Sequence, residues 1–150
     1  MSLEQELKRL GVWYRFIEKE ETIHTADASE STGIQLHRIT KNLVSITNEG
    51  ETVLLIIPGD RRVNLKKAAA ALGVSNVKLY PFSEAHLISG YQPGGTPSIG
   101  LKKRMRTILD AELRTMETFF CGGGTRDRLL ELRADDVIRV SEALVADITG

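Results

Sequence analysis

The chain has little cysteine, no long apolar run and no excess of charge of either sign. Its single cysteine, Cys121, excludes a disulfide within the chain and favours a reducing compartment. No stretch approaches the roughly 20 apolar residues that cross a bilayer, and the charged N-terminus lacks the apolar core of a signal peptide. Lysine and arginine number 20, as do aspartate and glutamate, so binding to nucleic acid would need a local basic patch. These absences favour a cytoplasmic protein that binds neither membrane nor DNA.

Residues that bind metals or act as nucleophiles are also scarce. His24, His37 and His86 lie far apart and share no ligand spacing with one another or with Cys121, so we expect no metal site. No Ser-His-Asp arrangement follows from the spacing. Cys121 could be a nucleophile, but a cysteine between an aromatic pair and three glycines is more often a small buried hydrophobe. We therefore favour chemistry that needs no cofactor and no strong side-chain nucleophile.

The apolar pattern predicts many short strands with short helices between them. Two strand-like runs, residues 39–47 and 52–57, flank Asn48-Glu49-Gly50 and predict a hairpin. A capping box of Ser2 with Gln5 predicts a helix to Leu10, Thr25 can cap a helix through about Thr32, and Asn64 can cap one over residues 65–72. A glycine follows each of these helices as its stop. Because the elements do not alternate as βαβ units, the pattern favours a mixed sheet or barrel over a doubly wound fold. A length of 150 residues is typical of one domain.

The segment from Gly90 to Gly100 contains four of the 13 glycines and two of the four prolines. Glycine lets a ligand approach the main chain closely and proline fixes the backbone, so we predict a stiff loop whose N–H groups can bind a ligand. Gly95 and Gly100 have the spacing that opens a P-loop, but Lys102 comes one residue late, and no Gly-x-Gly-x-x-Gly pattern is present. The loop is therefore a candidate cradle for an acyl group or the end of a nucleotide, or else a tight connection.

Lys41 lies in a strand-like run, on the same face as Ile39 and Leu43. It either reaches solvent from an edge strand or binds an anion, such as a phosphate or a developing oxyanion, and both interpretations remain open. A basic cluster follows the glycine loop directly, formed by Lys102, Lys103, Arg104 and Arg106. A second cluster contains Arg61, Arg62, Lys66 and Lys67. A solvated face is the default for each cluster, but basic residues beside a ligand-binding loop suit the end of a nucleic acid.

Three segments in this order resemble the YbaK and prolyl-tRNA editing family: Gly33 with residues 38–44, then residues 90–100, then residues 121–124 with 129–140. This family is an aminoacyl-tRNA deacylase domain, found free-standing and inserted in bacterial prolyl-tRNA synthetases. The similarity runs from about Trp13 to Ile148. It implies a single α+β domain over residues 1–150, with a mixed β-barrel or a strongly curved mixed sheet surrounded by short helices. It also implies hydrolysis of wrongly charged tRNA(Pro).

The resemblance also assigns roles to individual residues. The family's lysine corresponds to Lys41, and its Gly-x-x-x-Pro loop corresponds to residues 94–98, although the proline stands one position early and Ser98 occupies the place where many members have proline. The expected catalytic residues are Lys41, Gly94, Gly95 and Thr96. The expected substrate-binding residues are Thr25, Tyr91, Pro97, Ser98, Gly100, Cys121 and Gly122. The residues expected to bind the tRNA phosphates are Lys102, Lys103, Arg104 and Arg106.

The chemistry of an aminoacyl ester agrees with these expectations. Such an ester is already activated, so its hydrolysis needs a positioned water and a stabilised oxyanion more than a strong nucleophile. Amides of Gly94, Gly95 and neighbouring residues would stabilise the oxyanion, and Lys41 would anchor the terminal phosphate or polarise the ester. A small pocket would exclude larger, correct amino acids.

We therefore expect a free-standing trans-editing hydrolase that acts on the acceptor end of mischarged tRNA(Pro), with alanyl-tRNA(Pro) as the favoured substrate and a prolyl-tRNA synthetase as a candidate partner. The alternatives are a cysteinyl-tRNA(Pro) deacylase, a non-catalytic module that binds a tRNA end or a nucleotide, and a protein-interaction domain on the same scaffold.

Overall fold

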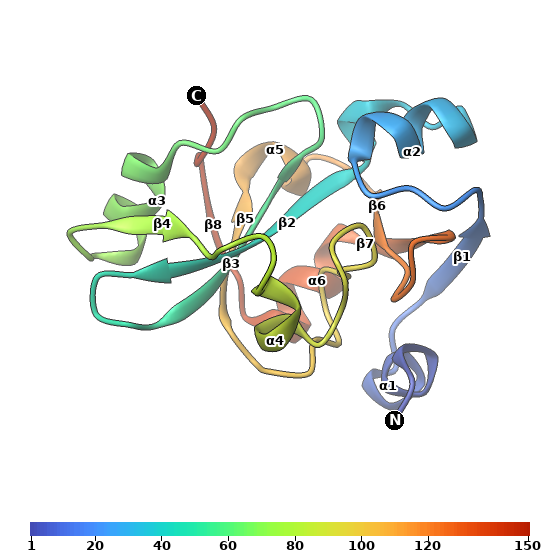
Figure 1. The fold of residues 1–150 in the computed structure, drawn as a ribbon, viewed down its shortest axis with the longest axis horizontal. Helices are drawn as coiled ribbons and strands as arrows, with labels where there is room; N and C mark the ends of the chain where they lie inside the picture. Colours follow the sequence, from blue (N-terminus) through green and yellow to red (C-terminus); the bar gives the residue numbers. More distant parts are fainter.

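Eight strands form two sheets in the computed structural model, which describes all 150 residues (Figure 1). The larger sheet has the strand order β4 (Val77–Leu79), β2 (Thr40–Thr47), β3 (Thr52–Pro58), β5 (Arg106–Asp110) and β8 (Leu144–Ala146). The smaller sheet has the order β1 (Tyr14–Glu18), β7 (Arg128–Arg133) and β6 (Thr118–Gly122). The larger sheet is mixed, because β4, β2 and β3 pair antiparallel whereas β3, β5 and β8 pair parallel. The smaller sheet is antiparallel throughout.

Short helices surround the two sheets (Figure 1). They are α1 (Leu3–Leu10), α2 (Thr25–Thr32), α3 (Leu65–Leu72), α4 (Ala85–Ser89), α5 (Ala111–Arg114) and α6 (Ala134–Ser141), and a 3-10 turn covers Leu36–Arg38. Side-chain caps begin three of them: Ser2 and Gln5 form a reciprocal capping box on α1, Asn64 accepts from the amide of Lys67 on α3, and Asp110 accepts from the amide of Glu112 on α5. None of the helices is both long and apolar enough to cross a membrane.

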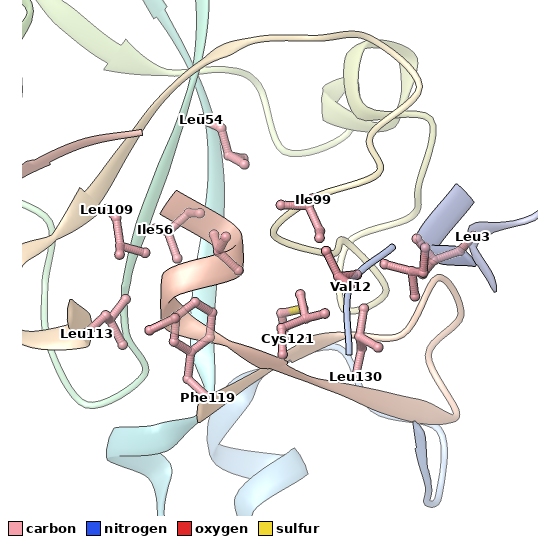
Figure 2. Packing of buried hydrophobic residues seen from close by; sticks show 14 of the residues in the cluster. Leu3, Val12, Leu54, Ile56, Ile99, Leu109, Leu113, Phe119, Cys121 and Leu130 are labelled. Carbon is pink, nitrogen blue, oxygen red and sulfur yellow. The ribbon is translucent and has the colours of Figure 1, made fainter. Parts of the chain in front are cut away.

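The core lies mainly between the two sheets. Leu54, Ile56 and Leu109 on one face of the larger sheet share a buried cluster with Phe119 and Leu130 of the smaller sheet (Figure 2). Helices α1 and α6 add buried side chains to this cluster. The opposite face of the larger sheet packs against α3 in a second cluster, and α2 packs against the smaller sheet in a third. The larger sheet is therefore covered on both faces, which explains the continuous apolar sequence of β3.

The predicted α+β domain with sheets and short helices is confirmed, but the barrel is not. The strands form two separate sheets, and the contact between their edges is a single bridge from Ile39, just before β2, to Phe120 in β6. A closed barrel needs a continuous ladder around the ring. One bridge leaves the ring open, and the site described next lies beside this opening.

Candidate functional site

A cavity of about 390 Å³ lies beside the first half of β2. Strand β4 pairs only with Ser45–Thr47, so residues 40–43 of β2 have an edge that no strand covers. The other walls come from the start of α2, the segment between β4 and α4, and the glycine loop. A cavity of this size is typical of sites for small molecules. No aspartate or glutamate lines it, and Lys41 is its one permanently charged lining residue.

The most buried part of the cavity lining, which we call the floor, is apolar. Ala28, Ile39 and Leu129 line the floor and are buried, and Gly122 lies beside them. The floor is therefore apolar, and two of its four residues have very small side chains.

The glycine loop forms a wall of the cavity because it packs directly on the turn between β6 and β7. The amide of Gly122 donates to the carbonyl oxygen of Thr96 at 3.1 Å, and the amide of Gly124 donates to that of Gly95 at 2.8 Å. A Cβ at position 122 would lie 2.5 Å from the Thr96 nitrogen. Gly94 has a φ of 89°, and a Cβ there would lie 2.7 Å from the carbonyl oxygen of Thr22. Only glycine permits these close approaches of main chain to main chain.

Several amides of this loop have no acceptor within the protein, and two of them belong to residues that line the cavity. The N–H groups of Gly94 and Thr96 make no intramolecular hydrogen bond, and both residues line the cavity. By contrast, the amide of Gly95 donates to the carbonyl oxygen of Gln92 at 2.9 Å, and Gly95 does not line the cavity. Unpaired main-chain donors at a ligand cavity can bind a carbonyl oxygen or an oxyanion. Of the candidate donors that the sequence indicated, Gly94, Gly95 and their neighbours, the structure leaves the amides of Gly94 and Thr96 free beside the cavity.

Lys41 lines the same cavity from β2. Its Nζ donates to the carbonyl oxygen of Arg61 at 2.9 Å, which is the one hydrogen bond of this ammonium within the protein. An ammonium has three N–H donors, so two are free for a ligand. The hydrogen bond restrains the end of a long side chain beside the cavity, which supports neither of the two sequence-based interpretations over the other.

An ion-pair network lies next to Lys41. The His37 ring lies between two carboxylates, with Nδ1 2.8 Å from Asp60 and Nε2 3.0 Å from Glu112. The hydrogen bond with Asp60 is the main cause that raises the pKa of His37 above its usual value. Glu112 also pairs with Arg61 at 3.4 Å. Asp60 and Arg61 both belong to this network, so it restrains the main chain whose Arg61 carbonyl oxygen accepts the hydrogen bond from Lys41.

A buried chain of hydrogen bonds connects the glycine loop to β2. Ser98 is 1% exposed, and its hydroxyl donates to Oδ1 of Asn42 at 2.6 Å. The Asn42 amide donates to the Thr40 hydroxyl at 2.9 Å, and that hydroxyl donates to the carbonyl oxygen of Phe120 at 3.2 Å. Thr40 and Asn42 line the cavity and were missed from the sequence. The signal was present, since alternation places Asn42 on the same face as Val44, and a polar residue on a buried face needs a partner.

The structure divides the residues expected at the site into two groups. Those that line the cavity are Thr25, Lys41, Tyr91, Gly94, Thr96 and Gly122. Those that do not line it are Gly95, Pro97, Ser98, Gly100 and Cys121. The thiol of Cys121 is fully buried in the main core (Figure 2), where burial raises its pKa to about 11. Cys121 therefore lies outside the cavity lining, and its raised pKa disfavours the thiolate that a nucleophile would need.

The basic residues that follow the loop also lie outside the cavity lining, and most have partners. Nζ of Lys102 donates to the carbonyl oxygen of Met1 at 2.7 Å and lies 5.5 Å from the centre of the Tyr91 ring. Arg104 pairs with Glu142, and Arg106 pairs with Glu51. Lys103 is exposed and makes no side-chain contact of this kind.

The chain is similar to known proteins over most of its length. The model of the aminoacyl-tRNA editing domain matches residues 19–140. A protein of Enterococcus faecalis, named "Putative Cys-tRNA(Pro)/Cys-tRNA(Cys) deacylase EbsC", is 31% identical over 136 residues, which cover 91% of this chain and 83% of that protein. A proline–tRNA ligase of Cupriavidus necator is 33% identical over 113 residues, which cover 73% of this chain but 19% of the ligase. The crystal structure of hypothetical protein APE2540 superposes with a TM-score of 0.91 at 28% identity and covers 99% of both chains.

Proposed function

The chain belongs to the aminoacyl-tRNA editing family, and from this we propose that it hydrolyses the ester of wrongly charged tRNA(Pro), with alanyl-tRNA(Pro) as its favoured substrate. The family and the class of enzyme expected from the sequence, an aminoacyl-tRNA deacylase, are confirmed by the family match and by the named relative. The choice of tRNA and of amino acid is our proposal. The observation that carries the proposed ester hydrolysis is that one cavity brings together Lys41 and the unpaired amides of Gly94 and Thr96.

In the proposed reaction the ester lies between Lys41 and the glycine loop. A water attacks the ester carbonyl carbon, and the amides of Gly94 and Thr96 donate to the oxygen that becomes negative. The bond from that carbon to the ribose oxygen then breaks, and the proton released by the water goes to the ribose oxygen. Lys41 uses its free N–H donors on the terminal phosphate or on the ester. The products are the free amino acid and uncharged tRNA, and no cofactor is needed.

The small floor of the cavity supports the choice of amino acid. With the ester at the loop, the side chain of the amino acid points to the floor formed by Ala28, Ile39, Gly122 and Leu129. Ala28 and Gly122 leave room for a methyl group, whereas Ile39 and Leu129 limit the size of what enters. An apolar floor of this kind discriminates by size and not by hydrogen bonding.

Cysteinyl-tRNA(Pro) is a second candidate substrate. The observation that favours it is the name of the Enterococcus faecalis relative, which gives Cys-tRNA(Pro) and Cys-tRNA(Cys) as that protein's substrates. The apolar floor suits a thiol as well as a methyl group, because a thiol behaves as a small hydrophobe.

We further propose that residues 1–150 act as one domain in trans. The match to EbsC over 83% of its length supports this, while the match to 19% of the ligase shows where a related domain occurs inside a larger protein. Delivery of the substrate by a prolyl-tRNA synthetase belongs to the same proposal.

The test is single-turnover deacylation of alanyl-, cysteinyl- and prolyl-tRNA(Pro). We expect rapid hydrolysis of the alanyl substrate, slower or equal hydrolysis of the cysteinyl one, and none of the prolyl one. Lys41→Ala should lower kcat/KM by about 100-fold, the cost of removing one donor to a developing charge. Lys78→Ala is the matched control, since this exposed lysine on β4 does not line the cavity.

Absence of hydrolysis of the alanyl and cysteinyl substrates would overturn the proposed function and would leave a module that only binds tRNA ends. Preference for cysteinyl-tRNA(Pro) would replace the favoured substrate with the second candidate. Equal activity of Lys41→Ala and Lys78→Ala would remove Lys41 from the mechanism alone.

A further inference from the structure

The mouth of the cavity is apolar and open to solvent. Ile23, Leu79 and Phe82 line it, and they are 41%, 45% and 61% exposed. They come from three segments: the loop before α2, the end of β4, and the connection from β4 to α4. Large apolar side chains that stay exposed around a hollow mark a surface where something binds.

The order of environments along the cavity matches the order of groups in an aminoacyl-tRNA end. The buried floor is small and apolar, Lys41 and the two loop residues with free amides are half-buried, and the exposed mouth is apolar again. In the substrate, the ester joins the amino acid to a ribose, and the terminal base is on the other side of that ribose. With the amino acid at the floor and the ester in the middle, the base reaches the mouth.

The size and charge of the cavity agree with this placement. A volume of about 390 Å³ falls in the range of sites for ligands larger than an alanyl group. The absence of lining carboxylates removes the repulsion that a nucleotide phosphate would meet beside Lys41.

We propose that Phe82, with Leu79 and Ile23, binds the terminal nucleobase of the tRNA, and that Phe82 stacks on the face of that base. This inference rests on the proposed function, because it places the base from the position of the ester. We call the surface formed by Ile23, Leu79 and Phe82 the platform. Stacking on an aromatic ring does not distinguish one base from another, so the platform provides affinity for any aminoacyl-tRNA end. The floor of the cavity then selects the amino acid.

The test uses two hydrolysis-resistant probes. One is 3′-alanylamido-3′-deoxyadenosine 5′-phosphate, and the other is the same compound with a hydrogen in place of the base. Binding of both is measured by calorimetry for the wild type, Phe82→Ala, Phe82→Tyr and Leu87→Ala. Leu87 on α4 is the matched control, because it is 70% exposed and apolar but does not line the cavity.

We expect Phe82→Ala to weaken binding of the probe with the base by about 5- to 150-fold and to leave the base-free probe unchanged. Phe82→Tyr, which keeps the ring, and Leu87→Ala should both bind like the wild type. An equal loss for the two probes, or no loss for either, would overturn the platform. An effect of Phe82→Ala on deacylation only when a prolyl-tRNA synthetase is present would also overturn the platform, since this surface would then contact the synthetase and not the base.

The outcomes for the inference and for the proposed function are distinguishable. Base-dependent binding without hydrolysis of any aminoacyl-tRNA would support the platform and overturn the deacylase proposal. Hydrolysis of the aminoacyl-tRNA together with equal binding of the two probes would support the deacylase proposal and overturn the platform.

Discussion

Ser98 holds the glycine loop by its side chain. Its buried hydroxyl donates to Asn42, one residue after Lys41, so a single hydrogen bond links the loop to the strand that carries the lysine. A proline restricts a loop by fixing its own φ, whereas a serine without a partner does not. In this chain the hydrogen bond provides the restraint that a proline ring would provide. It also joins the two parts of the proposed catalytic site, which are the glycine loop and the strand that carries Lys41.

Ser98→Ala should therefore impair catalysis as well as stability. Loss of the hydroxyl leaves Asn42 Oδ1 without its donor, which costs about 1–3 kcal/mol of unfolding free energy in urea denaturation. A small displacement of the Gly94 and Thr96 amides should lower kcat by about 10- to 100-fold, with KM little changed. Asn42→Ala should behave alike, and the double variant should lose less than the sum of the two single losses.

Thr107→Val is the control for this prediction. The buried hydroxyl of Thr107 donates to the carbonyl oxygen of Met105 and lies outside the cavity lining. This variant should lose stability and keep kcat. If Ser98→Ala loses no more kcat than Thr107→Val does, Ser98 has no positioning role.

At the scale of elements, the contact between the glycine loop and the turn after β6 sets the shape of the cavity wall. The main chain of the glycine loop contacts the main chain of this turn directly, and no side chain lies between them at Gly122. The position of the Thr96 amide therefore depends on the absence of a Cβ on the neighbouring strand.

Gly122→Ala should displace the loop and abolish most of the activity. The new Cβ would lie 2.4 Å from the carbonyl carbon of Gly95, so the loop must move away from the cavity wall. We expect a loss of at least about 100-fold in kcat/KM with the circular dichroism spectrum retained. Gly50→Ala in the β2–β3 turn is the control: its φ is 83° but its Cβ meets no atom within 4 Å, so it should cost about 1–2 kcal/mol of stability without affecting kcat. Equal kcat/KM losses in the two variants would show that the close contact at Gly122 has no special role.

The local elements were predictable, and their assembly was not. The capping box at Ser2, the cap at Asn64 and the hairpin after β2 all follow from residues close in sequence, and the structure has each of them. Helix α2 spans the predicted residues, but it begins after His24, whose side chain makes no cap, instead of being capped by Thr25. The division into two sheets depends on distant pairs, such as Val53 with Arg106, for which no local pattern exists.

The same distinction applies to the candidate site. The resemblance placed Lys41 and the glycine loop in one site, and both line the cavity. Alternation marks Asn42 as a polar residue that needs a partner, but that partner, Ser98, lies 56 residues away and no local pattern identifies it. The amide of Gly95 donates within a turn and is therefore not free for a ligand. Which of two adjacent amides is free depends on the conformation of the loop, and composition does not encode it.

At the scale of the whole molecule, positive and negative charges balance, and ion pairs partly neutralise the basic cluster after the loop. Arg104 and Arg106 each have a glutamate partner, whereas Lys103 has none. Exposed pairs of this kind are weak and exchange readily for a phosphate. We therefore keep this cluster, Lys102 to Arg106, as the proposed contact for the tRNA backbone.

Neutralising part of this cluster should reduce the salt dependence of tRNA binding. Lys103→Ala with Arg104→Ala should lower the slope of log Kd against log salt by about 1 for each phosphate that the variant no longer neutralises. The matched control is Arg62→Ala with Lys66→Ala in the other basic cluster, measured by filter binding at the same salt concentrations. A fall in slope for the control pair alone would place the tRNA over the other cluster.

Helix α1 lies against the glycine loop from outside the cavity. A Cβ at Gly100 would lie 2.9 Å from Cδ1 of Leu3, one at Gly124 would lie 3.2 Å from Cδ2 of the same leucine, and no residue of α1 lines the cavity. The helix also precedes residues 19–140, which the family model matches. Substitutions in α1 can therefore change how firmly the loop is held while every group that meets the substrate stays the same. Evolution thus has a means of adjusting the speed of proofreading separately from its accuracy.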